Sequence, residues 1–131
     1  MRKLKGWFIV LLISLSLFGM TACSDGGANS YEQITPQEAK TIMDTESGYV
    51  IIDARTTEEF AEGHIADAIL IPEYEIAARA EKELPNKDAL ILVYCRSGRR
   101  SKIASEELVK LGYTNIKEFG GIIDWPYEIL K

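Results

Sequence analysis

A short apolar run, Leu90 to Tyr94, leads directly into Cys95, a glycine and three arginines. Five consecutive apolar residues rich in β formers predict a buried strand, because the run is too short for a helix. A helical pattern follows from about Arg100 to Leu111. A buried strand that runs straight into a helix is typical of a mainly parallel sheet with helices on both faces. We therefore expect an α/β fold with Cys95 at the carboxyl end of a central strand.

The rest of the chain repeats this alternation of strands and helices. Thr35 is predicted to begin a helix, with Pro36 at its first position and Glu38 completing a capping box. Gly112 is predicted to follow the end of the helix after Cys95. We expect strands over residues 31–34, 49–53, 68–71 and 115–119, helices over 35–45 and 73–83, a helical turn over 57–61, and a helix or turn over 122–130.

The position of Cys95 predicts a reactive thiol. A turn from a strand into a helix places its sulfur near backbone N–H groups and the positive end of the helix dipole. Arginines add positive charge, and such surroundings favour the thiolate, which is the nucleophilic form of cysteine. The alternative is an inert buried cysteine beside solvated arginines. The clustering of three arginines near a helix start, where the dipole disfavours cations, argues for the reactive site.

The length of the loop bears on which chemistry the thiol supports. A phosphatase of the Cys-(x)5-Arg type wraps a tetrahedral phosphate with seven loop positions. Counted from Cys95, Arg100 is the sixth position and Ser101 the seventh. A six-position loop forms a smaller cradle, which suits a single terminal sulfur better than a phosphoryl group. A phosphatase or arsenate reductase is thus the less favoured interpretation.

The loop resembles that of the rhodanese family of sulfurtransferases, which has the form Cys-Arg-x-Gly-x-Arg. The matching residues are Cys95, Arg96, Gly98 and Arg100, with Ser97 and Arg99 between them.

Three further segments resemble the same family. They are Asp53 to Ile65, which contains Gly63-His64-Ile65, then Ala68 to Pro72, and Gly120 to Trp125. The resemblance covers about residues 31–131. Asp67 departs from the pattern, since family members often carry glycine there, and it lies away from the cysteine loop.

The resemblance implies a rhodanese-like fold and sulfur transfer through a persulfide on Cys95, with no cofactor and no metal. Three arginines in the loop of an acidic protein predict a small anionic sulfur donor, such as thiosulfate, with a thiol or cyanide as acceptor, and we expect a monomer. The remaining loop residues would bind the donor: Arg96, Ser97, Gly98, Arg99 and Arg100. Asp53 and Arg55 are expected to form a buried ion pair that supports the loop, with Glu59 as a possible third member. A non-enzymatic persulfide carrier or thiol-redox module is the alternative function.

Two single residues, a histidine and a tryptophan, complete the candidates for the site. His64 is the one histidine of the chain. We interpret it as a loop residue bonded to the backbone rather than as a base for Cys95, because the helix and the arginines can activate a thiol without one. Trp125 is interpreted as core or as a pocket wall.

The first 22 residues have the layout of a secretory signal peptide. A basic start, Arg2 to Lys5, precedes an apolar stretch from Trp7 to Phe18, and small residues precede Cys23. This apolar stretch is shorter than a membrane-spanning helix requires. Residues 1–22 and Cys23 together resemble a bacterial lipoprotein leader, which implies lipidation of Cys23 and a domain anchored outside the cytoplasm. An uncleaved anchor or ordinary secretion is the alternative, and residues 23–30 are predicted to form a flexible tether.

The net charge limits which ligands the domain can bind, and the number of cysteines bears on the role of Cys95. The formal net charge of −5 becomes about −8 without the three basic residues of the leader. An acidic domain argues against nucleic acid as a ligand. With Cys23 lipidated, Cys95 would be the one thiol of a domain in an oxidising compartment. A single cysteine there is more often reactive than without a chemical role.

Overall fold

The structure is a computed structural model that describes residues 30–131. The predicted signal peptide (residues 1–22), the lipidation site Cys23 and all of the tether except Ser30 lie outside the described residues.

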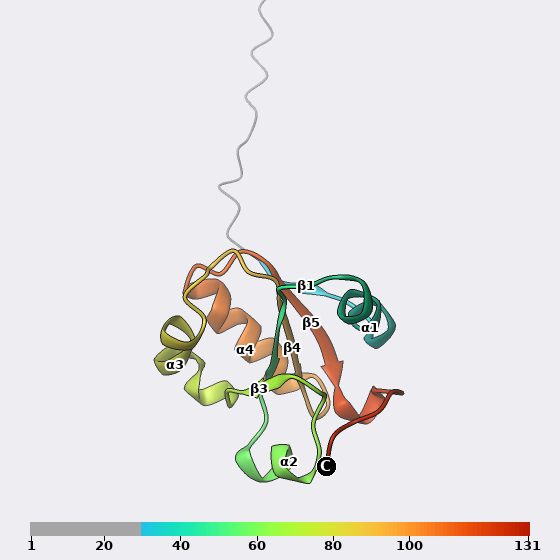
Figure 1. Ribbon diagram of the computed structural model, residues 1–131. Helices are drawn as coiled ribbons and strands as arrows, with labels where there is room; N and C mark the ends of the chain where they lie inside the picture. The colour runs from blue at the N-terminus through green and yellow to red at the C-terminus, as the bar shows by residue number, and fades with distance from the viewer. Residues whose placement is uncertain (1–29) are drawn as a thin grey trace, which may run out of the picture.

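Five parallel strands form one sheet in the order β1-β5-β4-β2-β3 (Figure 1). The predicted parallel sheet is therefore confirmed. β4 lies between β5 and β2, and all five of its residues are buried. The strands are β1 (Glu32–Gln33), β2 (Val50–Asp53), β3 (Ala68–Leu70), β4 (Ile91–Cys95) and β5 (Ile116–Gly121).

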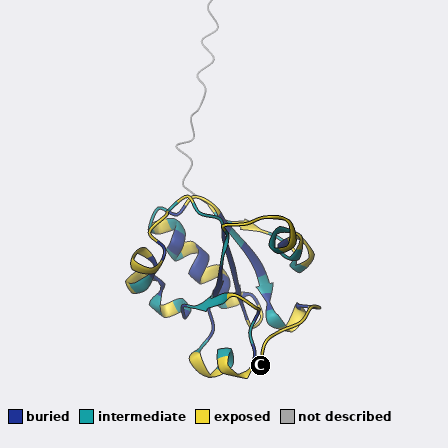
Figure 2. Cartoon of the chain, in the orientation of Figure 1, coloured by how far each residue is buried: buried dark blue, intermediate teal, exposed yellow. Residues whose placement is uncertain are grey.

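Helices cover both faces of the sheet, as predicted. In Figure 1, α1 lies on one face, and α3 and α4 lie on the other. Alternate residues of β4 supply the two cores: Leu92 and Tyr94 pack toward α1, whereas Val93 and Cys95 pack toward α4. Figure 2 shows this burial along β4 and the inner side of α4, with the outer sides of α1 and α3 exposed. The helices are α1 (Pro36–Thr45), α2 (Thr57–Glu62), α3 (Ile76–Glu83) and α4 (Arg99–Lys110), with 3-10 turns η1 (Glu73–Glu75) and η2 (Ile122–Asp124).

Local sequence signals account for the starts of two helices. The hydroxyl of Thr35 accepts from the backbone N–H of Glu38, whose carboxylate accepts from the Thr35 N–H, so the predicted capping box is confirmed. Thr56 and Glu59 form a second capping box at the start of α2. Both helices thereby satisfy backbone N–H groups that have no partner within the first turn.

The structure corrects two of the expected elements. The helix predicted over residues 73–83 is divided into η1 and α3. The element predicted over residues 122–130 is helical only in η2. Trp125 is extended because it precedes Pro126, and a proline has no N–H with which to continue a helix. The chain then returns to the main body, where Leu130 forms an antiparallel bridge with His64.

Candidate active site

Cys95 ends β4 at the carboxyl edge of the sheet and is 1% exposed. It is the one cysteine among residues 30–131, and its thiol is not part of a disulfide. Its neighbour on one side is β5, where Cys95 pairs with Gly121, and on the other side β2 ends at Asp53. In open parallel sheets, ligands bind beyond the carboxyl ends of the strands. The sequence-based placement of Cys95 at this edge is therefore confirmed.

The loop after Cys95 folds back over its sulfur. Gly98 adopts a φ of +100°, which is a left-handed conformation that glycine tolerates better than other residues. Its backbone N–H donates to Sγ of Cys95 over 2.9 Å. α4 begins at the next residue, Arg99, and Gly98 supplies no side-chain cap. The N–H groups of the first turn of α4 therefore remain available at the loop, together with the positive end of the helix dipole.

The end of β5 supports the loop from behind. A Cβ added to Gly121 would lie 2.0 Å from the carbonyl oxygen of Arg96 and 2.5 Å from Cα of Ser97. The backbone N–H of Ile123 donates to that same Arg96 oxygen over 3.2 Å. The pairing of β4 with β5 shifts between Val93 and Cys95, which leaves an extra residue in β5 beside the loop. Only a residue without a side chain at position 121 lets the loop and β5 approach so closely.

The three arginines of the loop are not equivalent. Arg96 and Arg99 are exposed, and neither takes part in an ion pair within residues 30–131. Arg100 donates two hydrogen bonds to Glu59, at 2.7 and 2.9 Å. The Arg100 hydrogen bond holds the pKa of Glu59 at about 2. Two of the arginines are thus free to meet an anion, whereas the third is shared with a carboxylate.

The Asp53–Arg55 pair is buried as predicted, but its contacts are not with the cysteine loop itself. Asp53 accepts from Arg55 Nη2 over 2.7 Å and from the hydroxyl of Tyr94 over 2.6 Å. Arg55 also donates to the carbonyl of Gly63 over 2.6 Å. Burial first, and then the Asp53 carboxylate, raise the pKa of Tyr94 well above its usual range, so that its hydroxyl stays protonated as a donor. Through Asp53, the pair contacts the hydroxyl of Tyr94, the residue that precedes Cys95.

The structure gives Glu59 and His64 separate partners, a loop arginine for Glu59 and a backbone carbonyl for His64. Glu59 is not the third member of the Asp53–Arg55 pair, because the structure pairs it with Arg100 instead. Glu59 thereby links α2 to the loop. The ring Nδ1 of His64 lies 3.0 Å from the carbonyl of Phe60, and the two rings stack at 3.8 Å. The interpretation of His64 as a loop residue bonded to the backbone is confirmed.

The comparison with family models assigns the fold. Residues 35–126 match the model of the rhodanese-like domain. The chain belongs to the rhodanese-like domain family. The matched range includes β2 to β5 and the whole loop that follows Cys95.

Individual relatives agree with this rhodanese-like assignment. The chain is 38% identical over 73 residues to thiosulfate sulfurtransferase PspE of Escherichia coli strain K12, covering 56% of this chain and 70% of PspE. It is 41% identical over 85 residues to a sulfurtransferase of Allochromatium vinosum, covering 64% of this chain and 77% of the relative. A solved structure of a rhodanese with anions from E. coli superposes with a TM-score of 0.60 at 35% identity, covering 63% of this chain and 98% of that one.

Two residues of the rhodanese-like site were not identified as site residues from the sequence. One is Ser101, the seventh position counted from Cys95, whose hydroxyl lies 3.3 Å from Sγ of Cys95. Glu118, on β5, accepts from that hydroxyl over 2.6 Å. One signal for Glu118 was present in the sequence. It shares a face of its strand with Ile116, and a charged residue at such an inward position is unusual.

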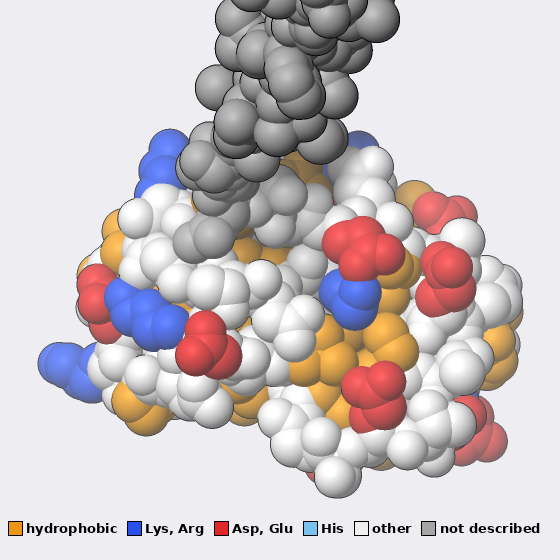
Figure 3. All heavy atoms as spheres, turned by 90° about the horizontal axis from the view of Figure 1, so that it is seen from above, with side chains coloured by type: hydrophobic (Ala, Val, Ile, Leu, Met, Phe, Trp, Pro, Cys, Tyr) orange, Lys and Arg blue, Asp and Glu red, His pale blue; other side chains and the backbone are white. Residues whose placement is uncertain are grey.

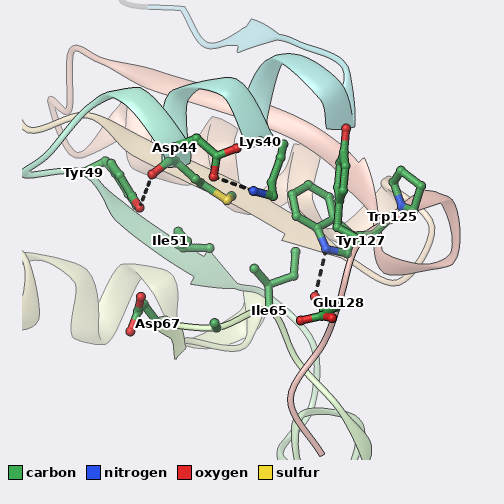
Figure 4. Close-up of a pocket in the computed structure, with 12 residues that line it drawn as sticks. Lys40, Asp44, Tyr49, Ile51, Ile65, Asp67, Trp125, Tyr127 and Glu128 are labelled. Atoms are coloured by element: carbon green, nitrogen blue, oxygen red, sulfur yellow. Dashed lines mark hydrogen bonds and ion pairs between the residues drawn. The ribbon is translucent and has the colours of Figure 1, made fainter.

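A groove lies apart from the cysteine loop, between α1 and the segment after η2 (Figure 4). Its volume is about 660 Å³, and none of its lining residues belongs to the loop. Trp125 forms part of its wall, as one of the two interpretations of that residue expected. The groove is lined by Lys40, Met43, Asp44, Tyr49, Ile51, Ile65, Ala66, Asp67, Trp125, Pro126, Tyr127 and Glu128.

Figure 3 looks down on the molecule from the top of Figure 1, and there acidic and basic side chains are scattered around hydrophobic ones. Within residues 30–131, no group of three potential metal ligands occurs. No helix of that same range is long and apolar enough to cross a membrane.

Proposed function

We propose that this chain is a sulfurtransferase that carries sulfur as a persulfide on Cys95. The observation that supports it most is the hydrogen bond from the Gly98 N–H to Sγ at 2.9 Å, at the start of α4. A donated N–H and a helix N-terminus stabilise negative charge on sulfur, both in the thiolate and in the persulfide. The relatives named as sulfurtransferases support the same activity.

The reaction has two steps. The Cys95 thiolate attacks the outer sulfur of a donor such as thiosulfate, the S–S bond of the donor breaks, and sulfite leaves with its electron pair. Cys95 then carries a persulfide with one negative charge. Cyanide or a thiolate attacks the terminal sulfur, and thiocyanate or a new persulfide leaves while the Cys95 thiolate is restored. The donor and acceptor balance one another, so no external oxidant, reductant or proton is required, and the protein needs only to hold and stabilise the negative sulfur.

The loop arginines recruit the anionic donor in this proposal. Arg96 and Arg99 are exposed beside the loop and have no carboxylate partner among the described residues. Their charge raises the local concentration of a small anion on a protein that is acidic as a whole. Arg100 adds charge at the start of α4, although Glu59 occupies two of its donors.

Where the chain acts is a separate proposal that depends on the sequence alone. The leader-like residues 1–22 and the cysteine at position 23 support export and lipid anchoring at the cell membrane. A flexible tether would then hold the sulfurtransferase domain near the membrane surface. Radiolabelled fatty acid incorporation, compared between the wild-type chain and Cys23→Ser, tests this.

The mass of the reduced chain after exposure to thiosulfate tests the activity. We expect a gain of one sulfur atom on the tryptic peptide Asp88–Arg96, which contains Cys95 and not Cys23. Cyanide is expected to remove the sulfur and release thiocyanate, and Cys95→Ala is expected to show neither event. A folded, reduced wild-type chain that gains no sulfur from thiosulfate or from a small persulfide would refute the proposal. Persulfide formation without turnover would instead support the alternative function, a non-enzymatic persulfide carrier.

A further inference from the structure

Glu118 is a buried carboxyl group that the proposed sulfur chemistry does not use. It is 3% exposed, and none of the ion pairs found among residues 30–131 includes it. Its Oε1 accepts two hydrogen bonds, one from the Ser101 hydroxyl at 2.6 Å and one from the Gly120 N–H at 2.8 Å. Burying a carboxylate without a cation is costly, so its place below the loop calls for a function.

The hydroxyl of Ser101 connects this carboxyl group to the cysteine. Its oxygen lies 3.3 Å from Sγ of Cys95 and also within reach of the carbonyls of Gly98 and Gly120, at 3.1 and 3.4 Å. A hydroxyl has a single proton to donate. The contact with Glu118 is the shortest, at 2.6 Å, and hydrogen bonds to a charged acceptor are the strongest. The proton of Ser101 is therefore committed to Glu118.

This commitment decides what Ser101 presents to the sulfur. With its proton on the Glu118 side, the Ser101 oxygen offers a lone pair to Cys95, and a lone pair accepts from a thiol S–H but repels a thiolate. Two hydrogen bonds result, one from the Cys95 S–H to the Ser101 oxygen and one from the Ser101 O–H to the Glu118 carboxylate. If the thiol loses its proton to solvent, two negative groups remain with one hydroxyl between them.

We propose that Glu118 is a positioning residue that acts through Ser101 to hold Cys95 as a protonated thiol when no sulfur donor is bound. The Gly98 N–H and the dipole of α4 favour the opposite, ionised state. The two influences therefore oppose one another at a single sulfur atom. A resting thiol reacts with oxidants more slowly than a thiolate does, which would protect an exported protein. Only this link to sulfur transfer and export rests on the proposals above.

Other charged groups near the sulfur come from each element around it. Arg96 and Arg99 are exposed on the loop, and Arg100 is paired with Glu59 of α2. On the β2 side, the Asp53 carboxylate is neutralised by Arg55. Glu118 differs from these two carboxylates. It accepts from the Ser101 hydroxyl, and it has no cation as an ion-pair partner among the described residues.

Alkylation of Cys95 by iodoacetamide tests the proposal without any sulfur donor. The rate is measured on the full chain between about pH 5 and 10, by the mass of peptide Asp88–Arg96. Glu118→Gln removes the charge and keeps an oxygen that can accept from Ser101 and Gly120. We expect the pH midpoint of alkylation to fall by about one unit, and the rate near pH 6 to rise about tenfold. Glu106→Gln, on the exposed side of α4, is the matched control and is expected to change neither.

Two results would overturn the proposal. An unchanged midpoint in Glu118→Gln would show that the carboxyl group does not influence the sulfur, and a raised midpoint would show that it withdraws the thiol proton instead. If Glu118→Gln does not fold, as judged by circular dichroism, Ser101→Ala gives a second test. It removes the acceptor of the S–H and is also expected to lower the midpoint, so an unchanged or raised value there would equally refute the proposal. Because no sulfur is transferred in this assay, its outcome is independent of the proposed activity.

Discussion

Replacing Gly121 by alanine is expected to disable the loop without unfolding the domain. The added Cβ would lie 2.0 Å from the Arg96 carbonyl oxygen and 2.4 Å from its carbonyl carbon. These are backbone atoms, so no side-chain rotation can relieve the overlap. Ordinary contact begins near 3.4 Å, and the loop must therefore move by about 1 Å or more from β5. Overpacking of this kind costs about 1–3 kcal/mol in the free energy of unfolding.

The effect on sulfur transfer should be larger than the effect on stability. A displacement of about 1 Å at a reacting group reduces the rate by about 100-fold. We therefore expect kcat/KM for thiocyanate formation from thiosulfate and cyanide to fall by about that factor in Gly121→Ala. Urea unfolding of the same samples establishes that the protein is folded.

Gly120→Ala is the matched control for this substitution. Gly120 has a φ of +88°, so alanine there is strained by about 1–2 kcal/mol, but no atom lies within 4 Å of the added Cβ. The two variants should lose comparable stability, and only Gly121→Ala should lose most of its activity. A folded Gly121→Ala protein with activity equal to that of Gly120→Ala would refute the argument that close backbone packing positions the loop.

Three further predictions concern charge. Replacing Arg96 and Arg99 by glutamine should raise the KM for thiosulfate about tenfold but not that for an uncharged donor, and equal effects on both donors would contradict charge recruitment. Glu59→Gln should cost about 1–2 kcal/mol at pH 7 by urea unfolding. The pKa of Glu59 is lowered from 4.5 to about 2 in the fold, so this stabilisation is complete above about pH 4.5 and is lost as the pH falls toward 2; a difference between wild type and variant that does not shrink over that range would count against the ion pair. Asp53→Asn leaves the buried Arg55 unpaired and should cost about 3–5 kcal/mol, so a fall in Tm of less than about 5 °C would be inconsistent with the buried pair.

The order of strands and helices was predictable because its signals are local. The apolar run before Cys95, the capping box at Thr35 and the glycines at turns each act over a few residues of the chain. From alternating strands and helices, a parallel sheet and a site at its carboxyl edge follow by general rules of chain connection. Of the helix or turn predicted over residues 122–130, only the short turn η2 forms, and the reason is local, since a helix rarely continues through the residue before Pro126.

The sequence by itself therefore predicted Cys95 as the candidate nucleophile and placed it at the carboxyl end of the central strand, where the structure has it. Only the tertiary structure decided which groups surround it. Glu59 meets Arg100 across 41 positions of the chain, and Ser101 meets Glu118 across 17. The contact of Gly121 with the loop depends on the shifted pairing of β4 with β5. Such contacts follow from strand order, register and helix placement, which come from the packing of the whole domain, so no local pattern of residues encodes them.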